Sequence, residues 1–552
     1  MDDQRDCWGR LTRVADEVPD EYEKEVLGVN GPGADHGQSE QHSDDETDGL
    51  SEKQSAFKGG LWVATSQVVP MVGTAALSVV IGRILGADEL GLQSFISYVQ
   101  ALLVALLFAA LTGATIQSLS TAVGAKDEEQ FDRLARWSVL ANSAGGIIAG
   151  AILVVFGLFS DTPLPWFLVA LTAFINSIGW GYTSIEVARN GWSAVGMRRL
   201  FTQTLSMVLG VAFVLVGFGI NGVFVASLIG AVIATIMMIK LAGRAPKADL
   251  FPFPRALLAI WGPFVFMEAL SQIVSQRMEF LFLNFYSTKE QIAMYSIPFM
   301  LISAVIMFPL TLIGAGMPHV AKSAGAGELE KSTQALGFAG RVVALLSLPL
   351  CAAVAAVGPA VVILLYGTDF MDAAHLLPLM ALSLSVAPLG VLYATFWTGS
   401  GKLRIPIWAF GIAGVIDLGL AWILIPHLEA VGAAIANLAG QLTLAILMIT
   451  LTARTAQKFP LPMLRIFAIT LVSVALFGMG TYAVNFVGLT SSASALIAMF
   501  AGMVAFMFPA VIFGRFVGFL GPTDAEWLRH TIPAKVGFAI PFIAGPKSSQ
   551  PN

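Results

Sequence analysis

The sequence predicts an all-α polytopic membrane protein of about 14 transmembrane helices, built as two six-helix lobes related by a parallel repeat with two extra C-terminal helices. Three observations predict this fold: the composition, a regular alternation of apolar runs and polar breaks, and a similarity between the two halves. Hydrophobic residues make up 56% of the 552 residues and charged residues 12%, with a mean hydropathy of +0.77. Soluble domains are about 25% charged, so the composition argues against a water-soluble enzyme.

The sequence lacks the features that mark several other classes of protein. The 31 Lys and Arg are outnumbered by 36 Asp and Glu, which leaves no net basic charge for binding nucleic acid. The two cysteines, Cys7 and Cys351, lie far apart and form neither a CxxC metal site nor a disulfide framework. The sequence has no P-loop, GxGxxG or HExxH pattern and no catalytic triad pattern. We therefore expect no catalytic residue, no metal and no cofactor, and a protein that is not an enzyme.

The N-terminal segment, residues 1–56, differs in character from the rest of the chain. It carries 16 acidic and 5 basic residues and is rich in Gly, Ser and Gln. Such a segment cannot bury enough apolar surface to offset its ordering entropy, so we expect a disordered acidic tail. Its start, Met1-Asp2-Asp3, has neither the basic residues nor the apolar run of a secretory signal.

From Gly60 onward, apolar runs alternate with short polar breaks. About 20 apolar residues cross a hydrocarbon core of about 30 Å as a helix, so each run is a predicted span. The fourteen predicted spans are 60–83, 91–117, 138–159, 164–188, 200–218, 221–242, 257–284, 292–316, 342–365, 374–397, 405–425, 430–453, 465–487 and 493–519.

The breaks between spans predict the orientation, because cytoplasmic loops carry an excess of Lys and Arg. The even-numbered breaks hold 18 basic residues, whereas the odd-numbered ones hold little beyond Arg83 and Lys289. We therefore expect both termini to be cytoplasmic. The loops on the other side of the membrane are all short, and the cytoplasmic loops hold no DxD-type acidic site. Both features argue against a membrane glycosyltransferase.

The chain resembles itself at an offset of about 201–210 residues, in the manner of transporters built from repeats. Gly113-Ala114 matches Gly314-Ala315, and Gly222 and Gly230 match Gly432 and Gly440. The two units have the same orientation, and a two-lobed arrangement with a central cavity favours a transporter over a channel, which would need a filter-like loop. The predicted parts are the tail 1–56, an N-terminal lobe 57–242, a cytoplasmic linker 243–256, a C-terminal lobe 257–455, two helices in 456–519 and a cytoplasmic tail 520–552.

Three short motifs resemble those of a known family. They are Ile84-Leu85-Gly86 with Glu89-Leu90-Gly91-Leu92, Leu365-Tyr366-Gly367-Thr368-Asp369-Phe370, and Leu424-Ile425-Pro426 with Gly432-Ala433-Ala434. Over residues 57–460 the chain resembles the oligosaccharide and polysaccharide flippases of the multidrug/oligosaccharidyl-lipid/polysaccharide (MOP) superfamily. This resemblance implies a fold like that of multidrug and toxic-compound extrusion (MATE) transporters. It also implies movement of an undecaprenyl-pyrophosphate-linked oligosaccharide across the inner membrane, with a polysaccharide polymerase and chain-length machinery as candidate partners. The acidic tail is not part of the family pattern.

Polar residues inside the seventh span form one stripe. A charged group at mid-bilayer costs about 2.5–3.5 kcal/mol on insertion scales, so a polar stripe must face protein or water. At about 100° per residue, the spacing i, i+3, i+4, i+7, i+8 and i+11 lies on one helix face. The residues are Glu268, Ser271, Gln272, Ser275, Gln276 and Glu279, and Gln67, Thr74 and Ser78 of the first span match three of them at an offset of 201. We expect this stripe to line a substrate cavity.

Other polar groups have two interpretations each. Asn176 and Trp180 share a helix face suited to sugar stacking, but ordinary helix packing predicts the same residues. Arg83 and Arg277 are candidate phosphate or ion-pair contacts, or else interfacial anchors that extend their charge toward the membrane surface. Asp417 is alone in an apolar run, where Asn437 or Gln441 of the next helix could satisfy it.

The drive for transport is expected to be an ion gradient or consumption of the product, because no P-loop is present for ATP. Glu268, Glu279 and Asp417 are the candidate coupling carboxylates for protons or sodium. The function predicted is therefore a flippase for a lipid-linked oligosaccharide that works within the lipid bilayer. The alternative is a cation-coupled multidrug exporter of the same superfamily.

Overall fold

The structure is a computed structural model that describes residues 70–189, 191–243, 266–267, 269–274, 278–325, 329–400 and 402–456. The predicted acidic tail, the linker 243–256 beyond Gly243, both helices in 456–519 and the C-terminal tail lie outside these residues. Within them the chain is almost entirely helical and contains no strand, which confirms the predicted all-α fold.

The first half of the described chain is a series of helices joined by tight turns. A first-span helix, Pro70–Leu85, ends at Gly86, whose φ of 91° requires the freedom of glycine. A π-helical turn, η1 (Ala105–Ala109), interrupts the second span. The longer helices are α4 (Ala87–Val104), α5 (Ala110–Ala125), α6 (Glu128–Leu158), α7 (Pro163–Ala188), α8 (Trp192–Leu215) and α9 (Gly219–Ala242).

The second half follows the same plan. Its elements are α11 (Glu279–Tyr286), α12 (Lys289–Gly325), α13 (Leu329–Tyr366), η2 (Thr368–Phe370), α14 (Met371–Gly399) and α15 (Arg404–Ala456). Helix α15 contains two passes, because Glu429 has a non-helical φ of 48° just after Pro426. The turn therefore falls where the sequence predicts the break between the eleventh and twelfth spans.

Eight helices among the described residues are long and apolar enough to cross a membrane. Several extend beyond the apolar run that predicts them, because polar turns at the membrane surface continue the helix. Helix α6 shows this clearly: it starts at Glu128, and the Asp127 side chain caps it by accepting a hydrogen bond from the Gln130 amide at 2.9 Å.

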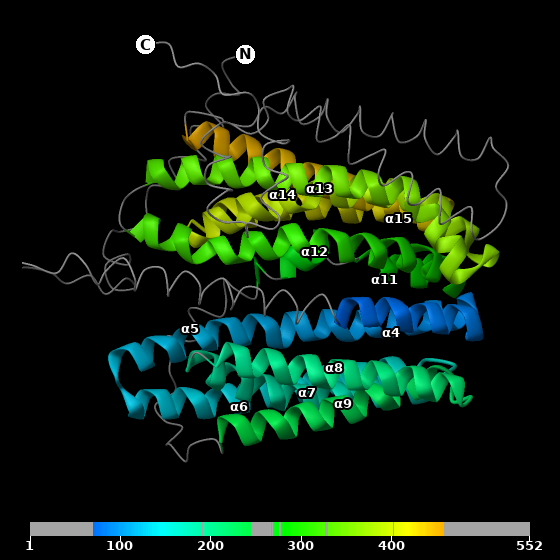
Figure 1. Cartoon of the computed structure of the whole chain (residues 1–552), viewed down its shortest axis with the longest axis horizontal. Coiled ribbons are helices and arrows are strands. Elements are labelled where there is room, and N and C mark those ends of the chain that lie inside the picture. The colour runs from blue at the N-terminus through cyan, green and yellow to red at the C-terminus, as the bar shows by residue number, and fades with distance from the viewer. Residues whose placement is uncertain are drawn as a thin grey trace, which may run out of the picture. The chain divides into compact units, whose positions relative to one another are not determined.

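Helices of the first half pack mainly on one another, and so do helices of the second half. The principal contact between the halves is made by α4 with α12, and Figure 1 shows α4 alongside α11 and α12. This contact is close, since a Cβ at Gly91 would meet the backbone carbonyl of Lys289. One apolar core continues from the first half into the second through this contact.

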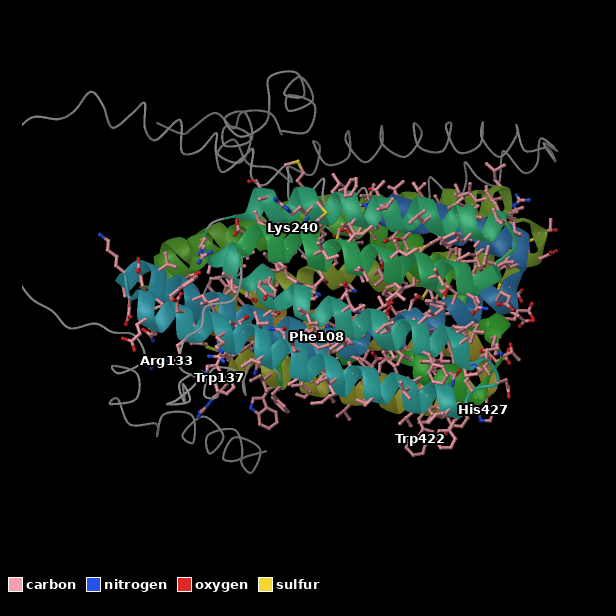
Figure 2. All side chains as sticks on the ribbon, turned by 90° about the horizontal axis from the view of Figure 1, so that it is seen from below. Phe108, Arg133, Trp137, Lys240, Trp422 and His427 are labelled. Atoms are coloured by element: carbon pink, nitrogen blue, oxygen red, sulfur yellow. The ribbon has the colours of Figure 1, made fainter. Side chains whose placement is uncertain are left out.

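The two ends of the described helices differ in charge. One end, which we name the basic end, carries basic residues in or near the turns between helices: Lys126, Arg133, Arg189 and Lys240. The opposite end carries Arg83 and His427 and is named the Arg83 end. Figure 2 shows Arg133 and His427 far apart, near opposite ends of the helices. By the positive-inside rule the Arg83 end is predicted to face away from the cytoplasm.

Packing within the first half predicts which glycines tolerate a side chain. Gly181→Val is expected to destabilise the protein by about 1–3 kcal/mol, because a Cβ at this buried site of α7 would lie 2.7 Å from Val139 Cα of α6. Gly113→Val is the control, since a Cβ there meets nothing within 4 Å. The measurement is thermal unfolding of the purified variants in detergent. Equal melting temperatures for the two variants would contradict the close α6–α7 packing.

Candidate functional site

Two carboxylates predicted as separate candidates, Glu279 and Asp417, come together in the second half. Glu279 is the first residue of α11, and Asp417 lies in the first pass of α15. Each side chain is only 1% exposed, and the two carboxylates face each other within hydrogen-bonding reach. We name them the carboxylate pair.

A chain of hydrogen bonds holds Glu279 on one side. Asn437 Nδ2 donates to Glu279 Oε1 at 2.9 Å, and the Ser383 hydroxyl donates to Asn437 Oδ1 at 2.6 Å. Because the Ser383 hydroxyl donates to the amide oxygen of Asn437, the NH2 group of Asn437 points toward the Glu279 carboxylate. The phenol of Tyr295, from α12, lies beside the same carboxylate. Helices α11, α12, α14 and α15 all contribute to this site.

Asp417 has a different environment. Neither of its oxygens accepts a hydrogen bond from a donor in the described residues, and the same holds for Glu279 Oε2. The carboxylate packs on the backbone of Gly440, where a Cβ would lie 3.0 Å from Asp417 Oδ2. The expectation that Asn437 or Gln441 satisfies Asp417 is wrong, because Asn437 donates to Glu279 and Gln441 Nε2 donates to the Val274 carbonyl at 2.6 Å.

The carboxylate pair has no cationic partner among the described residues. The ion pair found there joins Arg133 to Glu129 at 2.8 Å, on the surface of α6. Two like charges buried in contact repel strongly, because the interior screens them poorly. A shared proton, or a small cation held between the oxygens, removes this repulsion. No group of three or more His, Cys, Asp or Glu residues gathers in the described part of the chain, so the pair does not extend to a larger acidic metal site there.

The structure describes only part of the predicted cavity stripe. Glu268, Ser275, Gln276, Arg277 and the first-span residue Gln67 lie outside the described residues. Gln272 is buried, and α11 begins at Glu279 after a turn at Met278. The first-span counterpart of Glu279 is Ser78, whose hydroxyl lies 2.6 Å from the phenol oxygen of Tyr366 in α13.

The remaining candidates lie elsewhere. Asn176 and Trp180 are half-buried on α7 in the first half, whereas the carboxylate pair belongs to helices of the second half. Arg83 donates from Nε to the Leu365 carbonyl at 2.7 Å and from Nη2 to the Leu364 carbonyl at 2.6 Å. Its expected role as a phosphate contact stays a prediction.

Sequence reasoning did not select Ser383, Tyr295 and Gly440 as parts of this site. Gly440 does appear in the sequence as a repeat position that matches Gly230, but the repeat alone indicates packing. Ser383 and Tyr295 lie in apolar runs, and nothing in their local pattern points to a carboxylate from another helix.

The described helices match solved structures of membrane transporters. The lipid II flippase MurJ, in an inward closed conformation, superposes with a TM-score of 0.65 at 14% identity, over 84% of this chain and 99% of the flippase. An inward-facing multidrug resistance MATE transporter gives 0.58 at 17% identity, over 70% of this chain and 94% of its own. A MOP superfamily transporter from Pyrococcus furiosus gives 0.56 at 18%, over 73% and 96%.

The chain has the same fold as these transporters. This confirms the predicted two-lobed, MATE-like architecture. No family model matches the sequence, and no curated relative matches it. The likeness therefore lies in the three-dimensional arrangement.

The carboxylate pair leads to a stability prediction. In sodium-free buffer at neutral pH, Asp417→Asn is expected to raise the free energy of unfolding by about 1–3 kcal/mol, because an amide can donate to Glu279 Oε2 without the cost of first taking up a proton. The exposed Asp161→Asn is the control and should change it by less than about 0.5 kcal/mol. Thermal melting in detergent measures both. A melting temperature below that of the wild-type protein would contradict this prediction, because it would show that the wild-type pair of carboxylates stabilises the fold.

Proposed function

We propose that the protein is a flippase that moves a lipid-linked oligosaccharide across the bacterial inner membrane. The observation that supports this proposal is the extent of the fold likeness. The match with the lipid II flippase covers 84% of this chain at a TM-score of 0.65, against 70% and 0.58 for the inward-facing multidrug transporter. The substrate class we propose is an undecaprenyl-pyrophosphate-linked repeat unit used for a surface polysaccharide.

Transport would proceed by alternating access, in which the two halves rock against each other. The contact of α4 with α12 joins the two halves. It includes the close approach of Gly91 to Lys289, near the Arg83 end. Opening toward that side must separate this contact. The sugars would contact the predicted cavity residues, which are Gln67, Glu268, Gln272, Ser275, Gln276, Asn176 and Trp180. The pyrophosphate would contact Arg277 and Arg83. A polymerase and chain-length machinery are the partners proposed for the product.

The carboxylate pair is the proposed coupling site for a proton or a sodium ion. An ion that enters the pair removes the repulsion between Glu279 and Asp417, and its departure restores it. The residue after Glu279, Phe280, stacks on Tyr98 of α4 with ring centroids 5.1 Å apart and planes at 18°. A change at the pair therefore acts next to an aromatic contact between the halves, which gives the ion a direct route to the conformational change.

A second candidate function is a cation-coupled multidrug exporter. Both the fold likeness to multidrug transporters and the buried carboxylate pair fit that function as well. The two functions differ in the substrate, so a test must follow the cargo.

Deletion of the gene tests the cargo. We expect loss of surface polysaccharide and accumulation of undecaprenyl-linked repeat units on the cytoplasmic side, because synthesis of the unit continues while its export stops. Mass spectrometry of the lipid-linked sugars and staining of the surface polymer measure both. The intact gene on a plasmid must restore export. Normal polymer together with new sensitivity to cationic compounds would instead establish the drug exporter.

Glu279→Gln tests the coupling site in the restored strain. We expect polymer export to fall at least about tenfold at unchanged protein level, because the amide keeps the size of the side chain but cannot exchange the ion. Asp161→Asn, an exposed carboxylate far from the pair in sequence, is the matched control and should export normally. Full export by Glu279→Gln would remove the carboxylate pair from the mechanism.

A further inference from the structure

Arg83 joins the two halves of the chain at one end of the helices. It lies near the end of the first-span helix, and its guanidinium donates to the carbonyls of Leu364 and Leu365 in the last turn of α13. The last carbonyls of a helix have no partner within the helix and carry its negative partial charge. A planar cation with parallel N–H groups is therefore well suited to this helix end.

Further contacts place the first-span helix directly on the end of α13. The Ser78 hydroxyl and the Tyr366 phenol are 2.6 Å apart, on the buried side of the same contact. A Cβ at Gly82 would lie 3.0 Å from the Tyr366 ring and 3.3 Å from Phe370, so only glycine allows this approach without a shift. The contact is thus buried at Ser78 and Tyr366, whereas Arg83 contacts α13 at the exposed surface.

A second contact closes the same end. The Ser94 hydroxyl of α4 donates to the Ser296 hydroxyl of α12 at 3.2 Å, and Gly91 abuts the Lys289 carbonyl. The Arg83 end is therefore closed by two interfaces between the halves, one from the first-span helix to α13 and one from α4 to α12.

We infer that Arg83 is a latch that keeps the Arg83 end closed, and that this end opens only when the guanidinium releases both α13 carbonyls. This inference rests on the alternating access in the proposed function. The bonded edge, Nε with Nη2, is also the edge that a phosphate group takes bidentately. Arg83 can therefore meet a phosphate through that edge only after the latch has opened.

The latch is tested by the distance between two spin labels at this end, measured by double electron–electron resonance in lipid nanodiscs. The labels are placed at Asp88→Cys and Asp369→Cys, both exposed and from different halves, with Cys7 and Cys351 replaced by Ala. We expect Arg83→Gln to raise the population with the longer distance about three- to tenfold, because two charged hydrogen bonds at an exposed site are lost. Arg83→Lys should give a smaller increase, since an ammonium lacks the paired N–H groups of the fork.

Arg404→Gln, which removes the same charge from an exposed site at the start of α15, away from the Arg83 end, is the control and should leave the distances unchanged. An unchanged distance distribution in Arg83→Gln overturns the latch, even where that variant loses export, since the loss would then reflect a contact with substrate. An increased open population supports the latch whatever the cargo is. Failure of the lipid-linked substrate to accumulate in the deletion strain would therefore leave this result standing.

Discussion

The buried contact between Glu279 and Asp417 is the constraint around which the second half is arranged. Two carboxylates in contact inside a helical bundle are stable only with a proton or a cation between them. Among the described residues, neutral groups position them: Ser383 and Asn437 orient Glu279, and Asp417 packs on the backbone of Gly440. Such a site is unfavourable for stability alone, which is why we propose that it serves transport.

The position of the carboxylate pair connects it to the contact between the halves. Glu279 begins α11, and the next side chain, Phe280, is stacked between the halves on Tyr98. Arg83 and Ser78 of the first-span helix contact α13 at the Arg83 end. The carboxylate pair, the aromatic stack and the proposed latch thus lie on helices that touch one another.

The sequence predicts the helices well, because the length of an apolar run is set by the thickness of the bilayer. The turn at Glu429 and the break at Gly86 both fall where polar or glycine residues interrupt apolar runs. Helix ends are less predictable, and α6 starts ten residues before its apolar run because a polar cap extends it.

The sequence also singles out Glu279 and Asp417, since a charge in an apolar run needs a reason. It does not predict that they meet, because their distance depends on how four helices pack. For the same reason the sequence does not show that Asn437 donates to Glu279 rather than to Asp417. The Arg83 latch was not predictable, because its acceptors are backbone carbonyls that every residue possesses.

We propose that the carboxylate pair exchanges the ion that drives transport. The most direct test of this proposal is the charge moved when purified protein, reconstituted in proteoliposomes on a solid-supported membrane, meets a sudden step in proton or sodium concentration. The account predicts a transient current in the wild-type protein for one of the two ions and none in Asp417→Asn. Equal currents in the two proteins would show that the coupling ion binds elsewhere.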